Sequence, residues 1–567
     1  DATKWDHTKW SPNYRNDNRI ETHESGTAPC KTACPAHVAV QGYLKLAAQG
    51  RYDEALALIK RENPLPAICG RVCNRRCEDA CTRGRVDAAV AIDEVKKFIA
   101  QRDLDAATRY VPPVVTPTRA GGFDQKIAII GAGPAGLSCA FYLAEKGYKP
   151  VVFEKNERPG GMLTYGIPSF KLQKDVIEAE VEVIRLMGAE FRYGVEVGRD
   201  VTLDELRAQG FKAFYVAIGC QGGRLAGIPG EDAEDVTVAV DFLREVNSGK
   251  IDALPGRTIV VGGGNVAIDV VRNACRLGSE HVEMFCLESE AQMPASEEER
   301  REAIEDGAHI SCGWGPKEVH LDEAGRVCGI TFKRCTRVFD DEGRFAPEYD
   351  ENDLRRVDAD RVVMSIGQSI VWGDLLAGSK VELGRGQGAL ADPQTYQTAE
   401  PDIFVGGDVF TGPSFAIDAI AAGHEAAVSI HRFVQPGSTL TIGRNQRRYT
   451  ALDRDDVVIE SYDNASREVA RVDREREKVA PFSEYVETFT EEQVRAETAR
   501  CLGCGASIVD PNKCIGCGLC TTKCAFDAIH LDRDRPECST MVKYEQKLPS
   551  LGKYALKRAI KIKFGRK

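Results

Sequence analysis

The sequence predicts an α/β protein with two nested Rossmann-like domains, an N-terminal helical, cysteine-rich domain and a C-terminal ferredoxin-like module. Two observations support this fold class. Glycine-rich loops at 131–136 and 262–267 each follow a short apolar strand and open a helix, as in a Rossmann βαβ unit. Thirteen of the 20 cysteines fall in two groups, within residues 30–81 and 501–538.

Length and composition narrow the class of protein. A chain of 567 residues is too long for one hydrophobic core, so several domains are expected. Hydrophobic residues make up 43% and charged residues 28%, as in globular proteins. The net charge of −11 argues against nucleic acid as a partner.

Targeting signals are not visible. No apolar run reaches the ~18 residues of a membrane span, so no transmembrane segment is expected. Residues 1–18 are polar and aromatic, unlike a signal peptide. Closely spaced cysteines in a long chain favour metal ligands over disulfides, and together these features predict a cytoplasmic protein.

The N-terminal region divides by composition. Residues 1–25 are expected to be a polar arm and residues 26–105 a helical domain that alternates cysteines with helical patterns. Apolar residues at helical spacing predict helices over 38–48 and 52–61. A proline-rich run followed by a Gly-Gly pair marks 106–124 as a linker.

The first glycine loop has the full context of a dinucleotide site. It lies between an apolar strand at 126–130 and a helix, and Glu154 ends the next strand, about 20 residues on, where a ribose-binding acid is expected. Glycines permit the tight turn, the approach of backbone amides to a pyrophosphate and close helix packing. The predicted binding residues are Gly131, Gly133, Pro134, Ala135, Gly136 and Glu154.

A downstream segment indicates that this first dinucleotide is FAD. Gly407-Asp408 follows an apolar strand and resembles the motif with which disulfide-reductase-type flavoproteins bind the ribityl chain. Ala416 opens a helix whose N-terminus would stabilise a reduced, anionic flavin. Gly161 and Met162 are expected beside the isoalloxazine ring. The FAD domain is therefore expected in two parts, 125–250 and 358–435.

One feature of those reductases is missing. They often carry a redox-active cysteine pair beside the flavin, but residues 160–174 contain no cysteine. Electrons are therefore expected to leave the flavin by another route.

The second glycine loop predicts a nicotinamide nucleotide site in an inserted domain, 251–357. Glu288 ends the following strand and would accept both ribose hydroxyls of NADH while repelling the 2′-phosphate of NADPH; no arginine lies between Glu283 and Glu299. NAD(H) is thus expected, unless Glu288 is only a solvated strand-end residue. The predicted binding residues are Gly262, Gly264, Asn265, Val266, Ala267 and Glu288.

The C-terminal module, 501–540, contains the cysteine run of bacterial ferredoxins. The C-x2-C-x2-C-x3-C spacing wraps a [4Fe–4S] cluster, although Ala525 replaces the usual proline. These cysteines are Cys514, Cys517, Cys520 and Cys524. In two-cluster ferredoxins the fourth cysteine serves the other cluster, so a second cluster is expected on Cys524 with Cys501, Cys504 and Cys538.

The N-terminal cysteines offer enough thiols for one further [4Fe–4S] cluster. Cys69 precedes a run spaced C-x3-C-x3-C, and a structural zinc is the alternative occupant. The predicted ligands are Cys30, Cys34, Cys73, Cys77 and Cys81.

Two charged segments complete the chain. Residues 436–500 have little apolar periodicity and are expected to form an extended strap. The tail, 541–567, carries nine Lys or Arg and one acid, and a helix is expected over 554–562. It is either a solvated tail, a docking segment for an acidic partner or a membrane-surface helix.

Several motifs resemble the glutamate synthase small (β) subunit family. This family includes the N-terminal part of dihydropyrimidine dehydrogenase and a subunit of electron-bifurcating transhydrogenases. The likeness covers roughly residues 26–440 and implies FAD, a nicotinamide nucleotide and N-terminal [4Fe–4S] chemistry. The matching segments are Cys34-Pro35, 63–73, 131–136, 160–168, 293–295 and 501–504.

The N-terminal ligand set departs from the family's pattern. The family's C-x2-C pair is absent before Cys30, but a near-copy contains Cys501 and Cys504. One hypothesis is that this pair folds back to complete a cluster with Cys30 and Cys81; the rival is that it belongs to the ferredoxin module. Lys96 replaces a Gln or Glu ligand, so the resemblance implies fewer than two N-terminal clusters without C-terminal help.

The nicotinamide nucleotide site also differs from the family's pattern. NADPH-using members of the family carry two arginines where this chain has Leu287 and Glu288, which again favours NADH.

The sequence therefore predicts an NADH-oxidising, or NAD-reducing, FAD and iron–sulfur subunit of a larger oxidoreductase. It would pass single electrons to a partner subunit or ferredoxin. Hydride transfer to flavin needs positioning rather than an acid or base, so no catalytic side chain is expected. The alternatives are an NADPH-dependent glutamate-synthase-type small subunit and a non-catalytic electron-wiring scaffold.

Overall fold

The computed structural model describes residues 26–114, 122–457, 459, 462–505, 515–523 and 543–564. Two compact units are distinguished, Ser25–Gly505 and the combination of Asp1–Glu24 with Ala506–Lys567. In the second unit two helices are described, α18 (Leu519–Lys523) and α19 (Tyr544–Phe564), the latter including the helix expected over 554–562. None of the helices in the described ranges is both long and apolar enough to cross a membrane.

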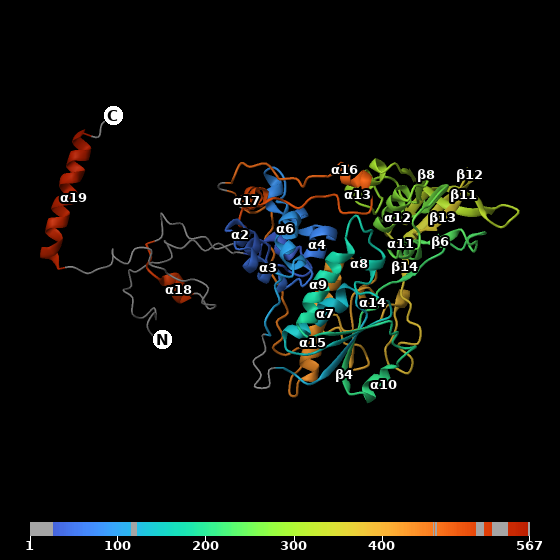
Figure 1. Cartoon of the computed structure of the whole chain (residues 1–567), viewed down its shortest axis with the longest axis horizontal. Helices are drawn as coiled ribbons and strands as arrows, with labels where there is room; N and C mark the ends of the chain where they lie inside the picture. Colours follow the sequence, from blue (N-terminus) through green and yellow to red (C-terminus); the bar gives the residue numbers. More distant parts are fainter. Residues whose placement is uncertain are drawn as a thin grey trace. The chain divides into compact units, whose positions relative to one another are not determined.

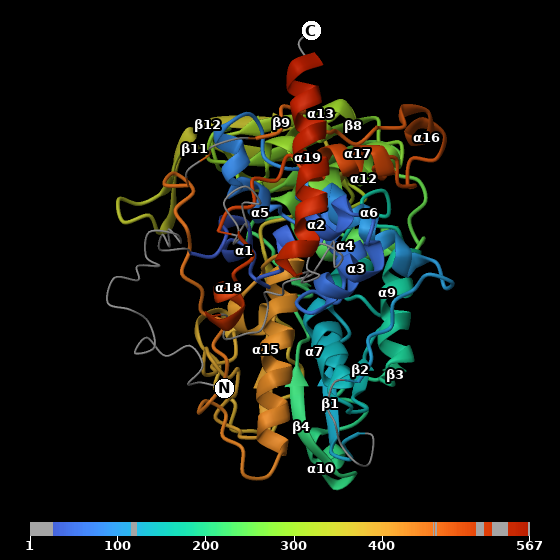
Figure 2. The same cartoon turned by 90° about the vertical axis from the view of Figure 1, so that its left-hand side faces the viewer.

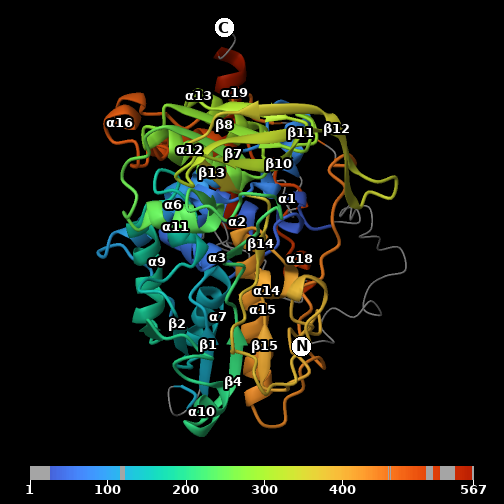
Figure 3. The ribbon, with the colours of Figure 1, turned by 90° about the vertical axis from the view of Figure 1, so that its right-hand side faces the viewer.

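The first sheet of the large unit is a five-stranded parallel Rossmann sheet. Side chains of its central strand alternate between two cores: Ile127 and Ile129 pack in one, Ala128 and Ile130 in the other. Helices α7 (Pro134–Glu145) and α15 (Ala416–Val434) lie side by side on one face (Figure 3). In spatial order the strands are β15 (Ile403–Val405), β4 (Phe211–Val216), β1 (Lys126–Ile130), β2 (Val151–Glu154) and β3 (Glu190–Tyr193).

The second sheet repeats the same architecture. Helices α11 (Ala239–Asn247) and α12 (Asn265–Arg276) pack in a common core, and α13 (Glu297–Glu305) follows. The parallel strands, in spatial order, are β6 (Val236–Val238), β13 (Arg361–Met364), β7 (Arg257–Val261), β8 (His281–Cys286) and β9 (His309–Cys312).

An antiparallel meander covers the other face of this sheet. Phe285 of β8 stacks on Phe332 of the meander with ring centroids 3.9 Å apart. Its strands are β10 (Trp314–Leu321), β11 (Val327–Phe339) and β12 (Phe345–Val357).

The expected boundary between the nested domains was wrong. The expected second part of the FAD domain, 358–435, includes β13, but β13 pairs with β6 and β7 in the second sheet. Residues 236–247 also belong to this second domain, since β6 joins its sheet and α11 its core. A buried parallel strand is apolar on both faces, so its sequence does not identify the sheet that it joins. The first domain resumes before β15, since Leu375 and Ala389 already pack in its core.

The N-terminal domain is helical, as expected. A buried carboxylate from the FAD domain ties it down: Glu180 of α9 (Lys174–Leu186) accepts hydrogen bonds from the backbone N–H of Ala67 (2.7 Å) and Ile68 (3.0 Å), at the start of α4. Figure 2 shows the blue helices above α9 and α7. Its elements are α1 (Pro29–Thr32), α2 (Val40–Ala48), α3 (Tyr52–Lys60), α4 (Pro66–Val72), α5 (Arg76–Asp79), the 3₁₀ turn η2 (Thr82–Arg85) and α6 (Ile92–Leu104).

The strap, residues 436–500, crosses the large unit and contacts both the helical domain and the second sheet domain. It contains two short helices, α16 (Arg474–Val479) and α17 (Glu491–Ala499), where only extended chain was expected. Figure 1 shows orange α17 beside blue α2 and α6, and α16 beside green α13. Glu484 of the strap lies 2.7 Å from Lys97 Nζ in the helical domain, while Tyr485 accepts a hydrogen bond from Arg272 in the second sheet domain (2.6 Å).

A fully buried ion pair holds the end of the strap. Arg500 and Glu497 are both 0% exposed, and Arg500 Nη1 donates to Glu497 Oε1 at 2.6 Å. Arg500 also contacts Asp87 (2.9 Å) and the Ala88 carbonyl (2.6 Å), while Glu497 accepts the Ala91 N–H (2.7 Å). This network satisfies both charges and fixes the chain just before Cys501.

We predict that Arg500→Ala strongly destabilises the protein. The change leaves Glu497 buried without its cation, a loss of about 3–5 kcal/mol. The measurement is urea-induced unfolding of the holoprotein, followed by far-UV circular dichroism. The matched control is Arg495→Ala in the same helix, whose pair with Glu491 is exposed and contributes less than about 1 kcal/mol. Equal unfolding curves for the two variants would contradict the role given to the buried pair.

Candidate functional site

The first glycine loop has the geometry of a pyrophosphate cradle. A Cβ on Gly136 would lie 2.0 Å from the Gly131 carbonyl oxygen, so helix α7 can approach β1 only with glycine there. Gly131 has φ +104°, a conformation that favours glycine. A Cβ on Gly133 would meet nothing within 4 Å, so the backbone there faces open space at the N-terminus of α7. Pro134 and Ala135 begin that helix.

Glu154 is held against this loop. It is 2% exposed, and its carboxylate accepts the N–H of Ala132 (2.8 Å) and of Asn156 (2.9 Å). Residues from the loop and from the ends of three strands, Glu154 among them, line a pocket beside this loop. Gly161, with φ +55°, brings the start of α8 (Met162–Tyr165) against Gly133.

The returning segment approaches the same loop from the other side. Gly407 has φ +65°, and a Cβ there would lie 3.1 Å from Ala135 Cβ. Asp408 opens α14 (Asp408–Thr411), and burial raises the pKa of its carboxyl to about 6. Ala416 is the first residue of α15. The predicted FAD residues are thus gathered at one edge of the first sheet.

The second loop repeats this construction. Gly262 has φ +139°, and a Cβ there would lie 2.2 Å from the Ser365 carbonyl oxygen. A Cβ on Gly264 would meet nothing within 4 Å. Asn265 opens α12 and accepts the N–H of Ser296 (3.2 Å), while Val266 and the buried Ala267 pack into the domain core.

Glu288 faces the second loop, with an arginine nearby. Its Oε2 would lie 2.8 Å from a Cβ on Gly263, so the carboxylate points at the loop. Arg334 comes from β11 and lies over the Trp314 ring, 5.1 Å from its centroid. Its Nη1 would lie 3.4 Å from a Cβ on Gly313, whose N–H donates to the Glu288 carbonyl oxygen. The sequence between Glu283 and Glu299 contains no arginine and so gave no sign of this guanidinium. The meander brings Arg334 back to the edge of the sheet from a later part of the chain.

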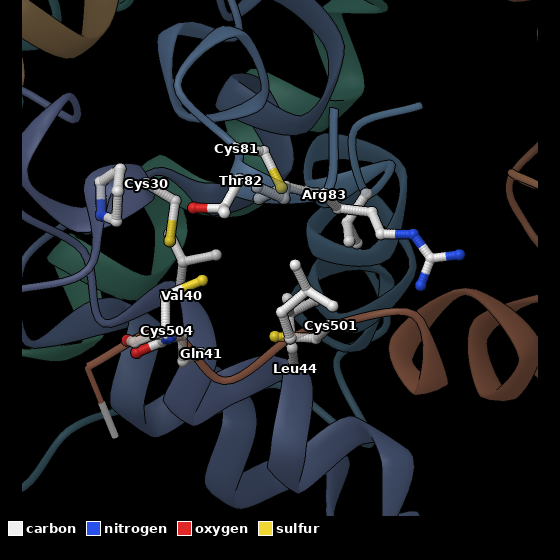
Figure 4. A pocket seen from close by; sticks show the side chains of 13 residues that line it. Cys30, Val40, Gln41, Leu44, Cys81, Thr82, Arg83, Cys501 and Cys504 are labelled. Carbon is white, nitrogen blue, oxygen red and sulfur yellow. Dashed lines mark hydrogen bonds between the residues drawn. The ribbon is translucent and has the colours of Figure 1, made fainter. Parts of the chain in front are cut away.

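Four cysteines from distant parts of the chain line one pocket (Figure 4). Cys30 comes from α1, Cys81 precedes η2, and Cys501 and Cys504 follow α17. Gln41 also lines the pocket, and its Nε2 donates to the Cys504 carbonyl oxygen at 2.6 Å. Burial, and then the neighbouring thiols, raise the pKa of Cys30. The structure therefore brings Cys501 and Cys504 to the N-terminal domain.

This arrangement suits a cluster better than a single ion. Within the described ranges, no three His, Cys, Asp or Glu side chains converge closely enough to hold one metal ion. In a [4Fe–4S] cluster each thiolate binds a different iron, so four cysteines around a wider space fit the group.

A second group of thiols lies behind the first. The thiols of Cys73 and Cys77 both lie close enough to Cys34 to interact with it electrostatically. Cys69 is one helical turn before Cys73. Lys96 is buried among them and forms an ion pair with Asp93. Burial lowers the pKa of Lys96, but Asp93 and the thiols outweigh this effect and hold it well above its usual value. A lysine in this state is a cation and not a ligand.

The ferredoxin-type run is described only in part. Cys517 is exposed and Cys520 half-buried. Cys514, Cys524 and Cys538 lie outside the described residues, as do the polar arm, 1–25, and most of the module.

The helical domain touches the expected flavin edge directly. Arg76 of α5 forms two hydrogen bonds with Asp418, in the first turn of α15 (2.9 and 3.2 Å). The Arg76 guanidinium also lies 5.5 Å from the centre of the Phe415 ring. The cysteine groups and the FAD loop thus belong to one contiguous structure.

Three family models match the chain. The model described as pyridine nucleotide-disulphide oxidoreductase matches residues 125–423. Dihydropyrimidine dehydrogenase domain II, with a 4Fe-4S cluster, matches residues 21–108. A 4Fe-4S binding domain matches residues 507–530.

Curated relatives match most of the chain. The β subunit of an NADP(+)-dependent formate dehydrogenase from Moorella thermoacetica is 35% identical over 84% of this chain and 70% of its own. The small chain of the NADPH glutamate synthase from Escherichia coli K12 is 35% identical over 72% of this chain and 89% of its own. An NAD-dependent dihydropyrimidine dehydrogenase subunit, PreT, from Escherichia coli O157:H7 is 32% identical over 72% of this chain and 91% of its own.

The cofactors follow from these matches. The first model implies FAD and NAD(P), and the other two imply [4Fe–4S] clusters. The glycine loops and the cysteine pocket fit these groups. The chain belongs to the pyridine nucleotide-disulphide oxidoreductase family, as an FAD- and NAD(P)-dependent iron–sulfur oxidoreductase related to the glutamate synthase small subunit.

Proposed function

We propose that this protein is an NADH-linked electron-transfer subunit that passes single electrons between FAD and a partner subunit or a ferredoxin. The observation that carries the proposal is the pocket of Cys30, Cys81, Cys501 and Cys504 in a domain hydrogen-bonded to the flavin edge. When bound, FAD and the clusters supply the conversion between two-electron and one-electron transfer. The protein's own residues bind, orient and shield them.

The preference for NADH rests on Glu288. Its carboxylate faces the loop where the adenosine ribose would lie, and an acid there accepts ribose hydroxyls but repels a 2′-phosphate. Arg334 is the residue that favours the NADPH alternative, because it offers a guanidinium near the same edge. Relatives of both types are named, NADP(+)-dependent and NAD-dependent.

The proposed cluster ligands follow the two groups of thiols. Cys30, Cys81, Cys501 and Cys504 would hold one [4Fe–4S] cluster. Cys34, Cys73 and Cys77 would hold another, with Cys69 as the fourth thiol of the group and Lys96 as a nearby cation. If Cys501 and Cys504 bind a cluster in the helical domain, they are not available for the second ferredoxin-type cluster expected with Cys524 and Cys538. The C-terminal module would then hold one cluster, on Cys514, Cys517, Cys520 and Cys524.

The partner is proposed from the family and the chain's appended module. Named relatives are subunits of glutamate synthase and formate dehydrogenase. A ferredoxin-type module and a basic helix, α19, would provide the contact with a partner that accepts electrons. The scaffold alternative is disfavoured because both nucleotide loops keep their open, glycine-lined backbones.

We predict that NADH, rather than NADPH, bleaches the flavin absorbance of the protein under anaerobic conditions. In Glu288→Gln the preference should fall by about tenfold, because the charge that repels the 2′-phosphate is gone. Stopped-flow absorbance at several concentrations of each nucleotide measures this. The exposed neighbour Glu290 provides the control, and Glu290→Gln should keep the wild-type preference. Faster bleaching by NADPH in the wild-type protein would instead support Arg334 and the glutamate-synthase-type alternative.

We predict that Cys501→Ala removes one cluster from the helical domain. Iron and acid-labile sulfide per chain should fall by the content of one [4Fe–4S] cluster, and Cys81→Ala should give the same loss, because both thiolates bind the same group. Iron analysis and EPR of the reduced protein measure it. Cys328→Ala, a half-buried cysteine outside both groups, is the control. Unchanged iron in Cys501→Ala, with loss in Cys81→Ala, would return Cys501 to the ferredoxin module.

A further inference from the structure

Two cysteines outside all cluster groups lie side by side in the second sheet. Cys286 ends β8, Cys312 ends β9, and the two residues are register partners in this parallel pair. Their Sγ atoms are 3.7 Å apart. Neighbouring strands lie about 4.8 Å apart, within the ~4.4–6.8 Å range of Cα separations that disulfides span. The thiols can therefore be joined without unfolding the sheet.

The pair lies directly beneath the second nucleotide loop. The Cys286 thiol donates to the Glu288 carbonyl oxygen at 3.6 Å. The N–H of Gly313, next to Cys312, donates to the same oxygen at 3.0 Å. A Cβ on Gly263 would lie 3.0 Å from Cys286 Cβ and 2.8 Å from Glu288 Oε2, so both side chains occupy the space that a side chain on the loop would need.

We propose that Cys286 and Cys312 form a reversible disulfide with a low-molecular-weight disulfide as oxidant, and that this bond weakens binding of the nicotinamide nucleotide. The inference rests on the proposed nucleotide site at Gly262–Ala267 and Glu288. It gives that site a second, thiol-dependent control.

The chemistry balances as thiol–disulfide exchange. The Cys312 thiolate attacks one sulfur of the oxidant, forms a mixed disulfide and releases one small thiolate. The Cys286 thiol loses its proton and attacks Cys312 Sγ, which forms the protein disulfide and releases the second small thiolate. Two protein thiols are oxidised and one external disulfide is reduced to two thiols; excess external thiol reverses both steps.

The two cysteines differ in exposure, as expected if Cys312 reacts first and Cys286 second. Cys312 is half-buried and accessible, whereas Cys286 is only 2% exposed. Burial also raises the pKa of the Cys286 thiol, which suits a resolving thiol better than the first nucleophile. The other ionisable groups beside the Cys286–Cys312 pair are Cys335 and Arg334 of β11 and the acid Glu288.

The bond changes the position of atoms that the loop contacts. Bringing the sulfurs from 3.7 Å to the ~2.05 Å of a disulfide shifts Cys286 Sγ, which donates to the Glu288 carbonyl oxygen in the reduced pair. Cys286 Cβ lies where a side chain on Gly263 would have to be, so the movement would be passed to the loop and to Glu288, two residues along the chain. Lower affinity for the nucleotide is the expected result.

The test compares reduced and oxidised holoprotein under anaerobic conditions. The full chain is incubated with glutathione disulfide or with reduced glutathione, free thiols are alkylated, and peptides are mapped by mass spectrometry. We expect a Cys286–Cys312 cross-linked peptide only after oxidation. The dissociation constant for NADH, measured by equilibrium titration, should rise by about tenfold on oxidation and return on reduction.

Two variants separate this effect from other oxidation. Cys312→Ser should bind NADH with the same affinity under both conditions, while Cys328→Ser, on β11, should respond like the wild-type protein. A stable glutathione adduct on Cys312 without the cross-link, or a cross-link with unchanged affinity, would overturn the inference. Failure of the reduced protein to bind either NADH or NADPH would instead overturn the proposed nucleotide site, and so the two failures are distinguishable.

Discussion

The buried ion pair between Arg500 and Glu497 is the constraint on which the cysteine pocket depends. Both side chains are fully buried, and a buried charge is tolerated only when it is paired and hydrogen-bonded. Each partner therefore also binds the backbone of the helical domain, between Asp87 and Ala91. The chain passes from this network directly into Cys501 and Cys504, which lie beside thiols from residues more than 400 positions earlier.

The same strap couples the parts of the protein that exchange electrons. It binds the helical domain through Glu484 and the nucleotide domain through Tyr485, neighbours in sequence. Across the two Rossmann domains, Lys171 lies 2.6 Å from Asp269, so the FAD and nucleotide domains are also joined by a charged contact. Arg76 and Asp418 join the cluster domain to α15. Electron transfer needs fixed separations between groups, and these polar contacts at domain borders provide them.

The choice of glycine in each nucleotide loop is set by short-range repulsion. Side chains at Gly131, Gly136 or Gly262 would overlap backbone oxygens at 2.0–2.5 Å, so glycine is required for the strand, turn and helix to close. Side chains at Gly133 or Gly264 would meet no protein atom. The first kind of glycine builds the fold and the second leaves room for a ligand, which is why the loops could be identified without coordinates.

Local sequence was enough to predict the two βαβ units, helix α15 and the general position of the cysteine groups, because glycine sterics, periodicity and ligand spacing act over a few residues. Even α17 had such a signal, the Thr490–Gln493 capping box, which was overlooked. Which sheet β13 joins, the return of Arg334 to the nucleotide edge, and the contact of Cys286 with Cys312 were decided only by the tertiary structure. These are pairings between distant segments, and burial and backbone hydrogen bonding select them only once the whole chain has folded.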